Sequence, residues 1–84
     1  MLMSIIMYTK QGCPWCDEVR SLLQEKAVPF EERECRNNKS NFDELVQKSG
    51  QSLTPTLDID GEIIADTDAA AVSQYFHQKG IAGF

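Results

Sequence analysis

Residues 4–19, SIIMYTKQGCPWCDEV, join a short apolar run to two cysteines that stand three positions apart. The mostly apolar residues 4–8 are typical of a strand buried on both faces. Pro14 fits the first turn of a helix, where a missing N–H costs nothing. Apolar side chains then follow at helical spacing, at Val19, Leu22, Leu23 and Ala27. The stretch therefore predicts a strand, a short connection and a helix that begins at the cysteines.

A charged strand and a second helix are predicted next. Val28-Pro29 should end the first helix, because a residue before proline avoids the α region. Residues 30–35, FEEREC, suit an edge strand exposed to water. Ser40 or Asn41 can cap the second helix, which Gly50 should end. Asp43 or Glu44 is expected to complete a capping box in this helix. Phe42, Leu45 and Val46 are expected to form its apolar face.

The last third of the chain predicts a hairpin and a third helix. TLDI (56–59) and EIIA (62–65) flank Asp60-Gly61, a strong signal for a type I′ turn. Thr67 or Asp66 is expected to cap the last helix. In that helix Ala69, Val72 and Phe76 are expected to share one apolar face. Gly80 is expected to end it.

This order of elements predicts an α/β fold. A strand, a crossover helix and a second strand give a right-handed parallel pair, to which the hairpin adds an antiparallel pair. We expect a four-stranded mixed sheet flanked by three helices, in a single domain over residues 1–84. Cys13 falls at the carboxyl edge of this sheet, where α/β folds usually place their sites.

Composition excludes several classes of protein. With 42% apolar and 25% charged residues the chain has the composition of a soluble globular protein, and a net charge of -5 has the wrong sign for binding nucleic acid. The N-terminal residues lack the features of a signal peptide, and three cysteines do not make a paired disulfide framework. We therefore expect reactive thiols in the cytoplasm, in a monomer that binds neither membrane nor nucleic acid.

The Cys-x-x-Cys motif has three possible uses. A structural zinc site needs four ligands, and Cys35 and His77 are not spaced to complete one. A structural disulfide between Cys13 and Cys16 closes too short a loop to constrain the unfolded chain much. Redox chemistry remains, and a single Cys-x-x-Cys in a βαβ context favours it.

The position of each sulfur gives the redox interpretation its physical basis. A helix N-terminus and the nearby charge of Lys10 stabilise a thiolate on Cys13, which makes it the nucleophile. Cys16 lies one turn deeper and can attack a mixed disulfide on Cys13. Trp15 offers an apolar face beside the sulfur. The carboxylates that follow the motif oppose thiolate formation, although they also suit a helix start.

Thr54-Pro55 is the second signal. A cis bond there would expose the backbone of Thr54 for pairing with an extended substrate, whereas a trans turn proline is the more frequent arrangement. The residues alone leave both isomers open.

The chain resembles the glutaredoxin family of the thioredoxin fold. KQGCPWC is similar to that family's lysine followed by Cys-Pro-Tyr-Cys, LTP stands at its Thr-Val-Pro, and DGEIIADTDA occupies the hairpin and the start of the last helix. The resemblance implies a dithiol oxidoreductase with glutathione as co-substrate, no metal, and Pro55 in the cis form. It implies that glutathione contacts Cys13 at its sulfur, with binding residues Lys10, Trp15, Gln51, Thr54, Pro55, Thr67 and Asp68.

Three departures from the family pattern weaken the expected glutathione contacts. Leu53 replaces a threonine, Ser52 stands where a basic residue is common, and Asp66 adds negative charge where the family often has glycine. They keep open a glutaredoxin-like electron donor reduced by thioredoxin reductase, for example for ribonucleotide reductase. An iron–sulfur carrier, with the cluster held by Cys13 of two subunits and glutathione, is a further alternative.

Two reactive residue types remain outside the motif. Cys35 is expected to be a small buried filler, with a third redox thiol as the alternative. His77, in the last turns of the third helix, is expected at the surface.

Overall fold

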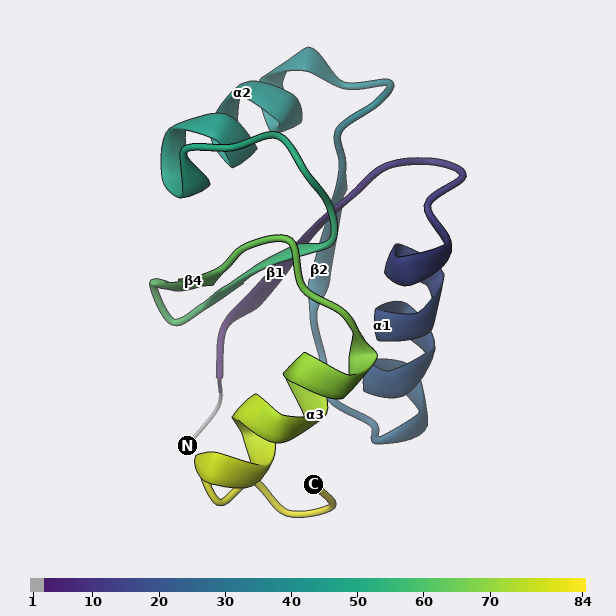
Figure 1. Cartoon of the computed structure of the whole chain (residues 1–84), viewed down its shortest axis with the longest axis vertical. Helices are drawn as coiled ribbons and strands as arrows, with labels where there is room; N and C mark the ends of the chain where they lie inside the picture. The colour runs from purple at the N-terminus through teal and green to yellow at the C-terminus, as the bar shows by residue number, and fades with distance from the viewer. Residues whose placement is uncertain (1–2) are drawn as a thin grey trace.

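The computed structural model describes residues 3–84, which form a four-stranded sheet covered by three helices (Figure 1). Along the chain the elements are β1 (Ile5–Thr9), α1 (Pro14–Glu25), β2 (Glu31–Glu34), α2 (Lys39–Ser49), β3 (Thr56–Ile59), β4 (Glu62–Ile64) and α3 (Ala69–Gln78). The strand order is β2-β1-β3-β4, with β1 and β2 parallel and the other two pairs antiparallel. The predicted thioredoxin-like sheet is confirmed. Within residues 3–84 no helix has the length and apolar character needed to cross a membrane.

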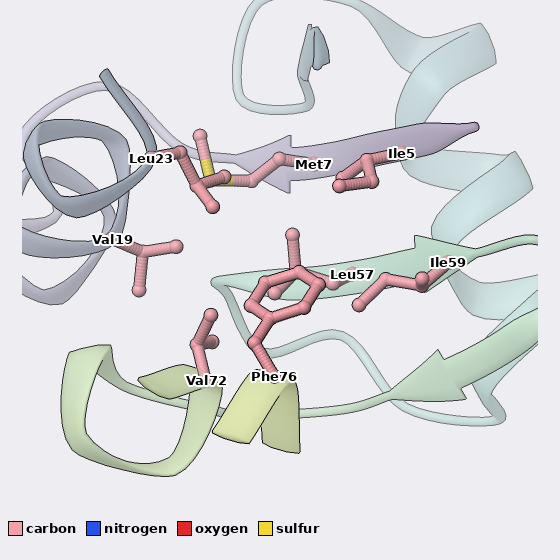
Figure 2. Close-up of a cluster of buried hydrophobic side chains, with 8 residues drawn as sticks. All are labelled: Ile5, Met7, Val19, Leu23, Leu57, Ile59, Val72 and Phe76. Atoms are coloured by element: carbon pink, nitrogen blue, oxygen red, sulfur yellow. The ribbon is translucent and has the colours of Figure 1, made fainter. Parts of the chain in front are cut away.

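The two faces of β1 pack against different helices. Alternate residues of a strand point to opposite faces, so Ile5 and Met7 join one core while Tyr8 joins the other. Figure 2 shows the larger core between β1, β3, α1 and α3, formed by Ile5, Met7, Val19, Leu23, Leu57, Ile59, Val72 and Phe76. The smaller core lies under α2 and consists of Tyr8, Cys35 and Leu45, with Ile6 and Phe42 packed against it.

The charged edge strand β2 and the turn of the β3–β4 hairpin both agree with the sequence-based predictions. β2 is an edge strand in which all four residues are charged, and charged side chains discourage pairing with another chain. In the β3–β4 hairpin Asp60 and Gly61 have φ angles of 51° and 92°. A type I′ turn requires positive φ at both positions, so the predicted turn is confirmed.

The end of α1 differs from the prediction. The helix stops at Glu25 and not at Val28-Pro29. Ala27 adopts the left-handed region with φ 56°, and the N–H of Val28 donates to the carbonyl of Leu23 at 2.9 Å. A left-handed residue usually ends a helix as glycine, so an alanine in this role gave no signal in the sequence.

Both predicted helix caps were wrong by one or more positions. Asn38, not Ser40 or Asn41, caps α2, and its side chain accepts the N–H of Asn41 at 3.1 Å. Asp68, not Thr67 or Asp66, caps α3, and it accepts the N–H of Ala71 at 2.8 Å. Several residues satisfy the cap preference in each stretch, and only the extended backbone of one of them leads into the helix.

The rest of α2 also differs in detail. Asp43 pairs with Lys39 at 2.7 Å, and Glu44 accepts the hydroxyl of Tyr8, so neither closes a capping box. Val46 is 38% exposed and lies outside the apolar face that was predicted to include it. The left-handed Gly50, with φ 69°, ends the helix as predicted.

Candidate functional site

A tight turn between β1 and α1 positions Cys13. Gly12 has φ 85°, and the N–H of Cys13 donates to the carbonyl of Lys10 at 3.1 Å. Cys13 is the N-cap of α1: its Sγ accepts the N–H of Cys16 at 3.1 Å, and Pro14 follows as the first helical residue. The sulfur therefore lies at the positive end of the helix dipole, which stabilises a thiolate.

The two cysteines of the motif are joined by a disulfide, and they differ in access. Their Cα atoms are 5.2 Å apart. Cys16 is fully buried, whereas Cys13 is half-buried. Trp15 between them is 60% exposed. An incoming thiol or disulfide therefore reaches Cys13 first, and Cys16 is placed to act only through Cys13.

The carboxylate of Asp17 does not stand alone beside this helix start. It pairs with the Arg20 guanidinium at 2.6 Å, and Arg20 binds Glu32 of β2 through two further nitrogens at 2.8 and 2.6 Å. The hydrogen bond from Arg20 lowers the pKa of Glu32 and keeps that carboxyl charged. Because Arg20 offsets the charge of Asp17, the opposition of this carboxylate to a Cys13 thiolate is reduced.

The Thr54–Pro55 segment faces the cysteine turn. Its peptide bond is cis, as the family resemblance implied, and Pro55 is buried. The Thr54 carbonyl oxygen lies 3.8 Å from Cys13 Sγ, and the Thr54 hydroxyl lies 3.7 Å from the same sulfur. The ladder between β1 and β3 begins only at the Tyr8–Thr56 pair. Thr54 thus borders the sulfur just outside the sheet.

Gln51 holds the loop that leads to this segment. Its Nε2 donates to Ser49 Oγ at 2.8 Å and to Thr56 Oγ1 at 3.1 Å. Its Oε1 accepts the N–H of Leu53 at 2.7 Å. The side-chain amide of Gln51, which the resemblance placed among the glutathione-binding residues, forms its hydrogen bonds within the loop, so the structure gives Gln51 a positioning role.

Lys10 lies on one side of the site, above the same loop. Its Nζ donates to the Ser52 carbonyl at 2.7 Å and stands 5.7 Å from the centre of the Phe42 ring. A pocket of about 510 Å³ opens there, lined by Lys10, Cys35, Arg36, Asn37, Asn38, Lys39 and Phe42. Three cations line it, and because Asp43 offsets the charge of Lys39, Lys10 and Arg36 are the two that make this side of the site attractive to anions.

A second pocket, of about 280 Å³, is lined by Trp15, Thr54, Asp66, Thr67 and Asp68. The N–H of Thr67 donates to the Pro55 carbonyl at 2.9 Å and ties this pocket to the cis segment. Thr67 is 7% exposed, and among the buried polar side-chain atoms of residues 3–84 its Oγ1 is the one without a hydrogen-bond partner.

The structure brings most of the predicted residues together. Cys13, Trp15, Thr54, Thr67 and Asp68 meet around one sulfur and one pocket, with Lys10 across the loop. Sequence reasoning missed Arg36 and Phe42, which join Lys10 in the larger pocket. A basic residue directly after the predicted second strand was the available signal for Arg36.

Cys35 and His77 lie where the sequence placed them. Cys35 is buried, as expected of a filler, and burial raises the pKa of its thiol. His77 is exposed, and its Nδ1 lies 2.7 Å from the backbone oxygen of Phe84.

A thioredoxin-like sheet with a half-buried N-cap cysteine, a fully buried partner cysteine and an opposing cis-proline defines a thiol–disulfide oxidoreductase. The family model described as Glutaredoxin matches residues 5–64. The chain belongs to the glutaredoxin family.

Individual relatives agree with this assignment. The chain is 32% identical over 65 residues to glutaredoxin 3 of Escherichia coli K12, which covers 77% of this chain and 78% of the relative. It is 37% identical over 71 residues to glutaredoxin 1 of Rickettsia conorii, covering 82% and 70%. The crystal structure of a thioredoxin-like protein superposes with a TM-score of 0.76 at 30% identity, covering 83% of this chain and 96% of the other.

Proposed function

We propose that this protein is a dithiol glutaredoxin that uses glutathione to reduce protein–glutathione mixed disulfides and protein disulfides. The observation that carries the proposal is the half-buried Cys13 sulfur, bonded to buried Cys16 and 3.8 Å from the carbonyl of Thr54. The Cys13 sulfur is accessible to a substrate, the buried Cys16 sulfur can react only with Cys13, and the segment at Thr54 lies beside them. The reducing cytoplasm suits such thiols, and we propose that the protein acts there as a monomer without a metal.

The reaction is thiol–disulfide exchange in two steps. The Cys13 thiolate attacks the glutathione sulfur of a mixed disulfide, the S–S bond breaks, and the protein thiolate leaves and takes up a proton. The Cys13–glutathione disulfide is then cleared by a second glutathione, which yields glutathione disulfide. Alternatively Cys16 attacks Cys13 Sγ and releases glutathione, which leaves the Cys13–Cys16 disulfide. Each route transfers two electrons from thiols to the substrate disulfide.

Glutathione would bind along the track formed by the two pockets. Its cysteinyl backbone pairs with Thr54, held in place by Pro55, and its glycine carboxylate meets Lys10. Its γ-glutamyl end occupies the pocket of Thr67 and Asp68, where the N-terminus of α3 favours a carboxylate and the unpartnered Thr67 hydroxyl needs a hydrogen bond. Trp15 forms the rim, and Gln51 acts by holding the loop.

The test compares two sources of electrons for the oxidised protein. One reaction contains glutathione with glutathione reductase and the other thioredoxin reductase alone, and NADPH consumption is followed with a glutathione mixed disulfide as substrate. We expect turnover with glutathione. Reduction by thioredoxin reductase alone would replace this proposal with that of an electron donor for a dithiol enzyme, a reading that the Asp66 carboxylate in the substrate pocket favours.

Two cysteine variants separate the roles of the sulfurs. Cys13→Ser should lose all activity, because it removes the accessible nucleophile. Cys16→Ser should still remove glutathione from proteins and should lose the reduction of protein disulfides that need both thiols. Turnover of mixed disulfides by Cys13→Ser would contradict the assignment.

A further inference from the structure

The two pockets next to the loop of residues 52–55 carry opposite charge. Lys10 and Arg36 line the larger pocket together with Lys39, whose charge Asp43 offsets, whereas Asp66 and Asp68 line the smaller one. Thr54 contributes to the smaller pocket and lies two residues after Ser52, whose carbonyl binds Lys10. A substrate that pairs with Thr54 therefore has a basic surface at one end and an acidic surface at the other.

The direction of the chain fixes which end of a substrate meets which charge. Residues 52–55 run from the Lys10 contact at Ser52 toward the Pro55 carbonyl, which accepts the N–H of Thr67. An extended peptide that pairs antiparallel to this segment runs the opposite way. Its residues before the reacting cysteine lie beside Asp66 and Asp68, and those after it lie beside Lys10 and the larger pocket.

The acidic side is a pocket prepared for a ligand and more than a group of surface carboxylates. Thr67, which lines this pocket, is 7% exposed, and its buried Oγ1 has no hydrogen-bond partner. An orphaned buried hydroxyl costs folding free energy that a bound hydrogen-bonding group recovers. The wall of the smaller pocket therefore holds an unsatisfied hydroxyl next to Asp66.

Asp66 is held at this border by its backbone. Its φ is 49°, in the left-handed region, and its N–H donates to Thr56 Oγ1 at 3.3 Å. Asp68 differs, because its carboxylate accepts the Ala71 N–H that caps α3. The Asp66 side chain does not cap α3, so its carboxylate can interact with a charged group that binds in the pocket.

We propose that Asp66 makes this site select its substrates by charge order, with a cationic residue before the reacting cysteine and an acidic residue after it. The proposal rests on the exchange reaction at Cys13 and the pairing at Thr54 described above. Glutathione satisfies the order only in part. Its glycine carboxylate matches Lys10, but its γ-glutamyl end carries an ammonium that Asp66 attracts and a carboxylate that Asp66 repels. A protein segment with the matched order meets no such conflict.

The test uses two peptides of identical composition, each with its cysteine bonded to thionitrobenzoate. One has two lysines before the cysteine and two glutamates after it, and the other has the reverse order. Reduced Cys13 attacks the peptide sulfur, thionitrobenzoate leaves as the better leaving group, and Cys16 then releases the peptide thiol as the Cys13–Cys16 disulfide forms. The absorbance of released thionitrobenzoate gives the second-order rate constant for each peptide.

We expect the matched peptide to react faster by roughly tenfold at low salt, since each solvent-exposed charge pair contributes about two- to fivefold. The preference should shrink as ionic strength rises. In Asp66→Asn it should fall by about two- to fivefold, because asparagine keeps the left-handed backbone and removes the charge. Glu25→Gln, which removes one exposed carboxylate at the far end of α1, is the matched control and should keep the full preference.

Equal rates for the two peptides, or a preference that survives Asp66→Asn unchanged, would overturn the charge-order proposal. Failure of the exchange reaction itself has a different signature. In that case the wild-type protein releases no more thionitrobenzoate than Cys13→Ser from either peptide, and no preference can be measured. A preference lost equally in Glu25→Gln would mean that net charge, and not Asp66, is responsible.

Discussion

The Thr67 hydroxyl is expected to lower the stability of the free protein and to strengthen the binding of substrate. It is buried without a partner in a residue that lines the pocket proposed for the γ-glutamyl end of glutathione. Thr67→Val keeps the branched shape and removes the orphaned oxygen, so the free energy of unfolding should rise by about 1 kcal/mol. The same change should raise the KM for a glutathione mixed disulfide several-fold, because the bound substrate loses a hydrogen bond.

Urea unfolding and steady-state kinetics of the Thr67→Val protein measure the two effects separately. A variant that is less stable than the wild type would mean that the hydroxyl has a partner in solution, such as a water. An unchanged KM would mean that no substrate group reaches Thr67. Thr54→Val is a useful comparison, because the Thr54 hydroxyl lies 3.7 Å from Cys13 Sγ and not in the buried part of the pocket.

Cys35 should be chemically inert although it lies close to the site. It is 3% exposed, and burial with the negative charge of Glu34 raises the pKa of its thiol, so little thiolate exists at neutral pH. With the Cys13–Cys16 disulfide formed, we expect native protein to take up iodoacetamide at Cys35 far more slowly than protein in denaturant. Mass spectrometry of the alkylated protein measures this. Equal labelling rates in both conditions would revive the alternative of a third redox thiol.

At the scale of elements, the sequence predicted which helices and strands exist better than where they begin. Cys13–Cys16 could be placed at a helix start because Pro14 and the helical spacing after it are local signals. The start of α2 could not be resolved in the same way. Asn38, Ser40 and Asn41 all have side chains that suit a cap, and the choice depends on the path of the chain leaving β2.

Two substitutions test the observed cap of α2. Asn38→Ala removes the acceptor of the Asn41 N–H and should lower the free energy of unfolding by about 1 kcal/mol. Ser40→Ala is the matched control, because Ser40 lies within the helix and alanine has the higher helix propensity, so stability should be unchanged or slightly higher. Urea unfolding of both variants gives the comparison. A larger loss in Ser40→Ala than in Asn38→Ala would contradict the assigned cap.

At the scale of the whole molecule, contacts between layers decided what the sequence pattern could not. The parallel pair followed from the crossover and the β3–β4 pair from the hairpin, whereas the pairing of β1 with β3 that joins them was not predicted. Glu44, in contrast, suggested a capping box, yet it accepts the Tyr8 hydroxyl of β1 and pairs with Arg33 of β2. These partners are remote in sequence and meet only after the sheet has formed. The larger pocket escaped prediction for the same reason, because Lys10, Arg36 and Phe42 come from three separate segments.

The hydrogen bond and the ion pair that join Glu44 of α2 to the sheet should make the free energy of unfolding depend on pH. The hydrogen bond from Tyr8, with those of Lys48 and the charge of Arg33, holds the pKa of Glu44 below its ordinary value of 4.5. A carboxyl whose pKa is lower in the folded state stabilises the fold at pH values above 4.5. That stability is lost as the pH falls from 4.5 through the lowered pKa, because in this range the unfolded chain binds the proton at Glu44 more tightly than the folded protein does.

Glu44→Gln should therefore lower the free energy of unfolding by about 1 kcal/mol at pH 7, and the difference from the wild type should narrow as the pH falls below 4.5. Urea unfolding at neutral and acid pH measures both effects. Glu25→Gln controls for net charge, since the chain carries -5 at pH 7 and loses that charge on acidification whatever its contacts. If Glu44→Gln and the wild type lost stability in parallel between pH 5 and pH 3, roughly the range in which paired carboxylates become protonated, the layers would be held by their apolar cores and not by this carboxylate.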